Sequence, residues 1–201
     1  MPAPPDQLRP LAGILLFDEV EVLDFAGPYE VFSGTRGPDG ATYLDVATIG
    51  PGAGEVTARG GLQVRPTYDL DTCPGLDALI VPGGPGADDS NELQRLRLLP
   101  FIRERAGSTP IVASVCTGAF LLGRAGLLDG RTATTHTSAL ARLRSEFPAA
   151  SVVEAKVVDE GAILTAAGVS SGIDLALHLL QRWFGDEARV RAARNLDGPW
   201  A

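Results

Sequence analysis

Cysteine, positive charge and long apolar runs are all scarce in this sequence. Two cysteines among 201 residues, Cys73 and Cys116, argue against a disulfide framework and favour a reducing compartment. The formal net charge of −8 argues against a nucleic-acid surface, which would need a basic stripe. No apolar run approaches the roughly 20 residues that a membrane-spanning helix requires. We therefore expect a cytoplasmic protein that binds neither nucleic acid nor membrane.

The chain has the length of one domain with a large buried core. Residues 1–10, MPAPPDQLRP, are rich in proline and have no apolar centre, so they do not read as a secretory signal. We expect a disordered lead-in over 1–10. No repeat or linker divides the rest, which predicts a single domain over 11–201.

Short apolar segments alternate with helical patterns along the chain. Residues 11–17, 78–81 and 111–115 resemble strands buried on both faces, and 43–49 is a further strand candidate. Residues 55–70 and 152–166 each read as a hairpin. Helices are expected over 23–32, 93–106, 117–125, 138–146 and 170–184, with a charged helical tail over 186–195. This alternation predicts an α/β fold with a mostly parallel sheet and helices on both faces. The functional site of such a sheet lies at the carboxyl ends of its strands.

Cys116 lies where the strand at 111–115 passes directly into the helix at 117–125. A helix N-terminus offers free N–H groups and the positive end of the dipole, and both stabilise a thiolate. A sharp strand-to-helix turn also lifts the side chain out of the sheet, as in the nucleophile elbow of hydrolases, and Gly118 permits close backbone approach. The pattern favours a nucleophilic thiolate, with a small buried hydrophobe as the alternative.

Asp24 follows a strand end and lies between Leu23 and Phe25. Apolar surroundings raise the pKa of a carboxyl group, which suits a proton donor or acceptor near neutral pH. The alternative is that Asp24 caps the helix that follows it.

Gly83 and Gly84 end the third strand in the motif PGG. Their backbone N–H groups are candidates for an oxyanion site, and a simple tight turn is the alternative. The segment has neither the GxGxxG spacing of a dinucleotide loop nor the lysine of a P-loop.

His136 follows Cys116 by 20 residues and is either a partner of the sulfur or a hydrogen-bonding turn residue. His178 falls within the helix at 170–184 and reads as structural. No segment has the ligand spacing of a metal site.

Together these segments resemble the ThiJ/PfpI superfamily over about residues 11–184. The matching motifs are LFDEVEVLDFAGP, VPGG, SVCTGAFLLGRAGLLDGRTATTH and ILTAAGVSSGIDLALHLL. The resemblance implies the class I glutamine amidotransferase-like fold, a flavodoxin-like αβα sandwich. Within the superfamily, the chain is most similar to isocyanide hydratase and to the sensor domain of AraC-type regulators. The protease-like branch usually has histidine directly after the cysteine, whereas this chain has Thr117, and Asp24 stands where a glutamate is common.

The resemblance to the hydratase implies a mechanism without a cofactor. Cys116 attacks the carbon of an isocyanide, and Asp24 supplies a proton and then activates water. The thioimidate hydrolyses to an N-substituted formamide. Thr117 and Gly84 would steady the intermediate, with Gly83, Gly118 and His136 also at the site. The superfamily implies a homodimer that acts on a small-molecule substrate.

The same residues are also compatible with two other functions. One is a cysteine-dependent hydrolase or a glyoxalase- or deglycase-like enzyme acting on another electrophile, because a fold does not define a substrate. The other is a sensor of small molecules or of redox state with no turnover, since an exposed thiolate oxidises readily.

Overall fold

The computed structural model describes residues 9–87 and 92–200, and a seven-stranded sheet forms its centre. In chain order the strands of this sheet are β1 (Leu11–Leu15), β2 (Asp45–Gly50), β5 (Tyr68–Asp69), β6 (Ala78–Val81), β7 (Ile111–Val115), β10 (Val157–Asp159) and β11 (Ile163–Ala166). All residues of β6, β7 and β11 are buried, as their apolar sequences predict.

The strands follow the order β10-β11-β7-β6-β1-β2-β5 across the sheet, and all neighbours are parallel except β10 and β11. The five strands β2-β1-β6-β7-β11 have the flavodoxin-like order 2-1-3-4-5. The expected α/β fold with a mostly parallel sheet is therefore confirmed. The order of winding reverses between β1 and β6, where ligands of such sheets bind.

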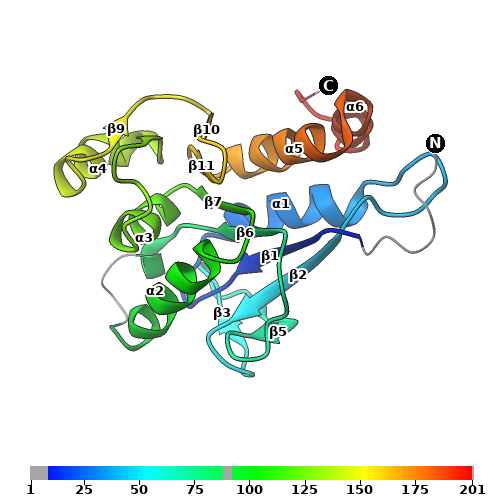
Figure 1. The fold of residues 1–201 in the computed structure, drawn as a ribbon. Coiled ribbons are helices and arrows are strands. Elements are labelled where there is room, and N and C mark those ends of the chain that lie inside the picture. The colour runs from blue at the N-terminus through cyan, green and yellow to red at the C-terminus, as the bar shows by residue number, and fades with distance from the viewer. Residues whose placement is uncertain (1–8, 88–91, 201) are drawn as a thin grey trace.

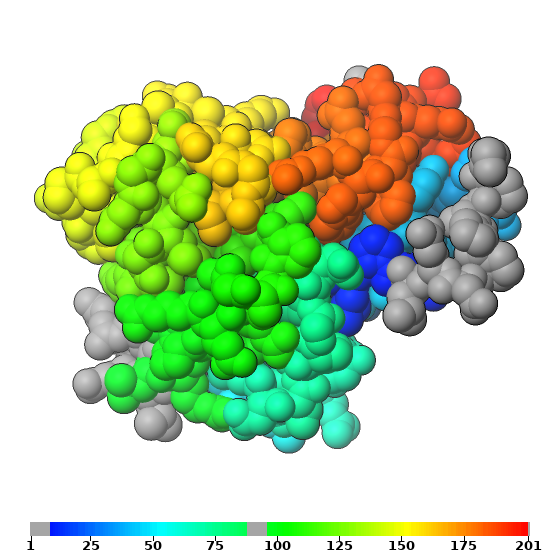
Figure 2. Space-filling view, in the orientation of Figure 1, coloured from blue at the N-terminus to red at the C-terminus, as the bar shows by residue number. Residues whose placement is uncertain are grey.

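Helices cover both faces of the sheet (Figure 1). On one face α1 (Val22–Gly34) packs against α5 (Ser171–Phe184), and α5 packs against α6 (Asp186–Asn195). On the other face α2 (Glu92–Ala106) packs against α3 (Gly118–Arg124) and β7. The space-filling view shows α5 and α6 at one corner of the molecule, in orange and red (Figure 2). The opposite upper corner contains α4 (Leu140–Glu146).

Two expected elements differ in detail from the structure. The hairpin expected over 152–166 forms only between β10 and β11, because β9 (Ser151–Val152) pairs instead with β8 (Thr132–Ala133) in a separate two-stranded sheet. The hairpin expected over 55–70 is limited to β3 (Val56–Thr57) and β4 (Gln63–Val64), and β5 joins the main sheet beside β2.

A disordered lead-in was expected over 1–10, and residues 1–8 of it lie outside the described residues. Arg9 and Pro10 belong to the fold: Arg9 pairs with Asp45, and the Pro10 carbonyl accepts a 2.9 Å hydrogen bond from the Asp45 N–H. Across residues 9–87 and 92–200, no helix is long and apolar enough to span a membrane.

Candidate active site

Cys116 forms a strained turn at the carboxyl end of β7. Its φ angle is 58°, which residues other than glycine rarely adopt. Its N–H donates to the carbonyls of Ala166 (3.1 Å) and Ala167 (2.8 Å), and its own carbonyl accepts from Thr135 Oγ1 (2.7 Å). These bonds hold the turn from two neighbouring segments, so the nucleophile elbow expected from the sequence is present.

The start of α3 touches the end of β6 backbone to backbone. A Cβ atom at Gly118 would lie 2.1 Å from the Val81 carbonyl oxygen, and one at Gly83 would lie 2.5 Å from the Thr117 nitrogen. Gly118 therefore permits the close approach that the sequence predicts. The contact brings the PGG turn directly against the elbow.

We expect Gly118→Ala to lower the free energy of unfolding by about 2 kcal/mol or more, because the new methyl group meets rigid backbone. Gly75→Ala is the matched control, since a Cβ there would meet none of the described atoms within 4 Å. Urea denaturation of both variants measures the difference. Equal stability of the two variants would contradict the close contact.

Asp24 reaches the elbow from the first turn of α1 and is fully buried. Its Oδ2 accepts a 2.8 Å hydrogen bond from the Gly83 N–H, whereas Oδ1 has no hydrogen-bond partner of normal geometry among the described atoms. Burial raises the pKa of Asp24 to about 7, although the Gly83 N–H opposes the shift. The N-cap of α1 is Glu21, so the alternative that Asp24 caps this helix is wrong.

Cys116 is 6% exposed and lies beside the Asp24 carboxyl group. Burial, followed by the negative charge of Asp24, raises the pKa of the Cys116 thiol to about 11, against the opposing effect of N–H groups from Thr117 and Val169. The sequence predicted a thiolate stabilised by the helix N-terminus, and this prediction is corrected for the resting protein. Burial and the Asp24 carboxylate raise the thiol pKa by more than the short helix α3 lowers it. Two adjacent buried anions are unfavourable, so the pair retains at least one proton at neutral pH. A thiolate forms when that proton moves from sulfur to Asp24.

The N–H groups of the PGG turn are already engaged. Gly83 donates to Asp24, and Gly84 donates to Thr117 Oγ1 at 2.9 Å. Gly84 has φ 120°, and a Cβ there would lie 2.4 Å from the Glu19 carbonyl oxygen. The turn therefore positions the acid and Thr117, and its role as an oxyanion donor stays a prediction.

His136 lies near the site, but its ring nitrogen Nδ1 interacts with Ser138. Its Nδ1 accepts from the Ser138 N–H (3.2 Å) and lies 2.8 Å from Ser138 Oγ. Its ring packs against Gly168, where a Cβ would lie 2.2 Å from Cδ2. In the structure His136 therefore caps the short turn at Thr137–Ala139, and its ring lies against Gly168, the residue before Val169.

Two features of the site were not expected from the sequence. Val169 directs its N–H at the Cys116 sulfur and has a φ of 42°. Arg59 forms a 2.6 Å ion pair with Glu21 and interacts electrostatically with Cys116. Val169 could have been predicted at the site from its position just after β11, because β11 is the parallel neighbour of β7 and both strands end at the same edge of the sheet. No group of three His, Cys, Asp or Glu side chains within 9–87 and 92–200 is arranged to hold a metal ion.

The chain is similar in sequence to known proteins. The isonitrile hydratase of Pseudomonas putida is 40% identical over 175 residues, which cover 86% of this chain and 72% of that protein. The HTH-type transcriptional regulator GbdR of Pseudomonas aeruginosa is 29% identical over 185 residues, or 92% of this chain. The chain spans 50% of the length of that regulator.

The fold also matches solved structures. A ThiJ/PfpI family protein from Pseudomonas syringae superposes with a TM-score of 0.82 at 28% identity, covering 95% of this chain and 76% of that one. The model of the DJ-1/PfpI family matches residues 12–182, which include the elbow, Asp24 and the PGG turn. The chain therefore belongs to the DJ-1/PfpI family.

Proposed function

We propose that the protein is a cysteine-dependent isocyanide hydratase, converting R–N≡C and water into an N-substituted formamide. The observation that carries the proposal is the buried pair of Cys116 and Asp24, whose thiol and carboxyl groups interact directly. A relative 40% identical to this chain is named for the same reaction. A thiol beside one positioned acid/base is what this covalent chemistry requires.

In the first step the Cys116 proton moves to Asp24 and the sulfur attacks the isocyanide carbon. Asp24 returns the proton to that carbon, which gives the thioimidate Cys–S–CH=N–R. The pKa of about 7 lets Asp24 accept and release a proton near neutral pH. The Val169 and Thr117 N–H groups steady the sulfur as its charge develops.

In the second step Asp24 takes a proton from water, which adds to the C=N carbon. Asp24 gives that proton to the nitrogen. The C–S bond then breaks as the hydroxyl proton passes to the sulfur, which restores the thiol and releases the formamide R–NH–CHO. All protons in the cycle come from the thiol, the carboxyl group and water, so the reaction needs no cofactor.

The remaining residues bind and position the substrate in this proposal. The Gly84 N–H holds Thr117 Oγ1, and Gly118 allows α3 to begin close to β6. A groove of ≈ 580 Å³ beside Val169 and His136 accommodates the R group. We also propose a homodimer through α1, on which Leu23 and Tyr29 are 39% and 40% exposed. A monomeric mass in light scattering would contradict the homodimer.

The test follows formamide production from an aromatic isocyanide by the wild type, Cys116→Ala and Asp24→Asn. We expect turnover by the wild type only, with a loss of at least about 1,000-fold in each variant. Turnover retained by Cys116→Ala would rule out the proposed mechanism. Turnover of dicarbonyls or activated esters instead of isocyanides would point to a hydrolase or glyoxalase on the same residues.

The likeness to a transcriptional regulator supports a second candidate, a sensor without turnover. A sensor would bind a small molecule or oxidise at Cys116 without consuming isocyanide. The same assay separates the two candidates, because only the hydratase releases formamide.

A further inference from the structure

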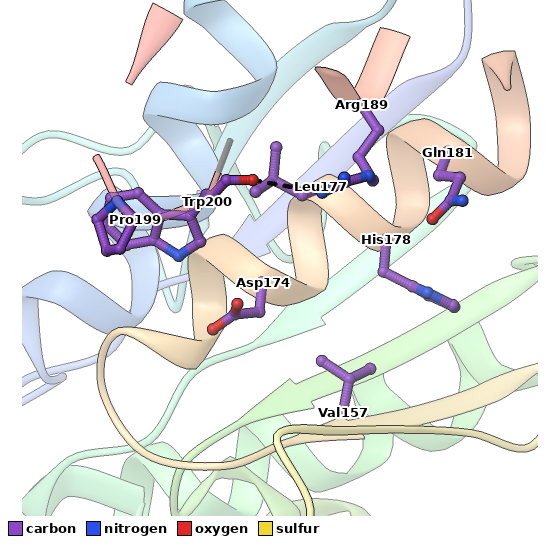
Figure 3. Close-up of a pocket in the computed structure, with 8 residues that line it drawn as sticks. All are labelled: Val157, Asp174, Leu177, His178, Gln181, Arg189, Pro199 and Trp200. Carbon is purple, nitrogen blue, oxygen red and sulfur yellow. Dashed lines mark hydrogen bonds between the residues drawn. The ribbon is translucent and has the colours of Figure 1, made fainter. Parts of the chain in front are cut away.

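A second groove lies on the outward face of α5, formed by residues other than those of the Cys116 site. Asp174, Leu177, His178 and Gln181 have the spacing i, i+3, i+4 and i+7, so they share one helix face. Val157 of β10, Arg189 of α6 and the segment with Pro199 and Trp200 close the groove from the other sides (Figure 3). Its volume is ≈ 330 Å³, within the range of small-molecule sites.

Arg189 is the cation of this groove, and its hydrogen bond to Trp200 and its ion pair with Asp186 are long. Its Nη1 donates to the Trp200 carbonyl at 3.4 Å, and its Nε lies 3.9 Å from Asp186 Oδ1. The side chain is 33% exposed. A guanidinium has five N–H donors, so Arg189 retains the capacity to bind a carboxylate.

Asp174 is the anion, and its partner is loosely held. Lys156 Nζ lies 3.4 Å from Asp174 Oδ1, with the lysine side chain 77% exposed and the aspartate 20% exposed. An exposed ion pair of this kind contributes little stability, so a ligand ammonium can replace Lys156 at small cost.

The two charges lie on opposite sides of an apolar floor. Figure 3 shows Arg189 on one side of Leu177 and Asp174 on the other, with the Trp200 indole beside them. His178 already has a hydrogen-bond partner, because its Nε2 lies 2.7 Å from Asp159 Oδ2. Asp159 also pairs with Arg182 at 3.2 Å. The groove therefore presents one positive group, one negative group, an apolar floor and an aromatic wall.

We propose that this groove binds a small zwitterion with an ammonium group and a carboxylate, such as a free amino acid. The carboxylate pairs with Arg189, and the ammonium replaces Lys156 at Asp174. The apolar part of the ligand covers Leu177, and the Trp200 ring face attracts the cationic end. The proposal does not depend on the reaction at Cys116.

The test is a calorimetric titration with L-leucine, with 3-methylbutylamine, which lacks its carboxylate, and with 4-methylpentanoate, which lacks its amine. We expect saturable binding of leucine, at least about tenfold weaker binding of either analogue, and a similar loss in Arg189→Gln and Asp174→Asn. Arg191→Gln is the matched control, since Arg191 lies on the same helix and pairs with the exposed Glu187. The control should bind leucine like the wild type.

Leucine binding to Cys116→Ala distinguishes this groove from the elbow. We expect this variant to bind leucine with the wild-type affinity. Unchanged melting temperatures of Arg189→Gln and Asp174→Asn would show that these variants lose binding without unfolding. Quenching of Trp200 fluorescence by leucine, measured in Trp183→Phe, gives an independent readout of binding. The proposal is overturned by the absence of saturable leucine binding, by equal binding of either analogue, by wild-type affinity in both variants, or by loss of binding in Cys116→Ala.

Discussion

Asp24→Asn is expected to stabilise the protein at pH 8, even though it removes the proposed acid/base. The fold raises the pKa of Asp24 from 3.8 to about 7, chiefly through burial. The folded state therefore binds this proton more tightly than the unfolded state. The stability that this provides is complete below pH 3.8 and is lost as the pH rises through 7. At roughly 1.4 kcal/mol per pH unit, the ionised carboxylate costs on the order of 4 kcal/mol above that pH.

Asparagine stays neutral at every pH and retains an oxygen that can accept from the Gly83 N–H. Thermal unfolding at pH 8 should show a melting temperature higher by roughly 10 °C, and the gain should largely disappear at pH 4. The exposed Asp129 provides the control Asp129→Asn, which should change little at either pH. A loss of stability at pH 8, or an equal gain at both pH values, would show that the carboxyl group is not held at a raised pKa.

The same substitution should make the Cys116 thiol more reactive while isocyanide turnover is lost. The Asp24 carboxylate is the second largest cause of the raised thiol pKa, after burial. Its removal lowers the thiol pKa and leaves the N–H groups of Thr117 and Val169 in place. We expect alkylation by iodoacetamide at pH 8 to become about tenfold faster, the effect of a pKa lower by about one unit.

Cys73→Ser is the background for this experiment, so that label incorporation, followed by mass spectrometry, reports Cys116 alone. Faster alkylation together with lost turnover would assign Asp24 to proton transfer during the reaction. Slower alkylation would mean that Asp24 helps to ionise the thiol in the resting protein, and unchanged alkylation would mean that its charge does not act on the sulfur. Either result would contradict the proposed order of proton movements.

Local sequence patterns predicted the frame of this site. The apolar runs that became β1, β6 and β7 are buried on both faces, which makes them recognisable without knowledge of their neighbours. The elbow followed from a strand passing directly into a helix at Cys116. The direction of the Asp24 pKa shift was predicted from Leu23 and Phe25, although Leu23 is exposed and the shift comes from burial in the fold.

The features that the sequence did not predict depend on contacts between distant segments. The thiol pKa is set by how deeply Cys116 is buried and by a carboxyl group 92 positions earlier in the chain. The Val169 N–H reaches the sulfur because β11 pairs with β7. The strand expected from residue 152 was divided because β9 pairs with β8, a pairing with no local signal.

In the proposed mechanism, Cys116 bonds to the isocyanide carbon during turnover. Acid quenching during turnover, followed by intact-mass spectrometry, measures this directly. We expect an added mass equal to one complete isocyanide molecule, located on the peptide that contains Cys116 and absent from Cys116→Ala. Formamide production at the wild-type rate by Cys116→Ala, with no adduct on the wild type, would contradict it.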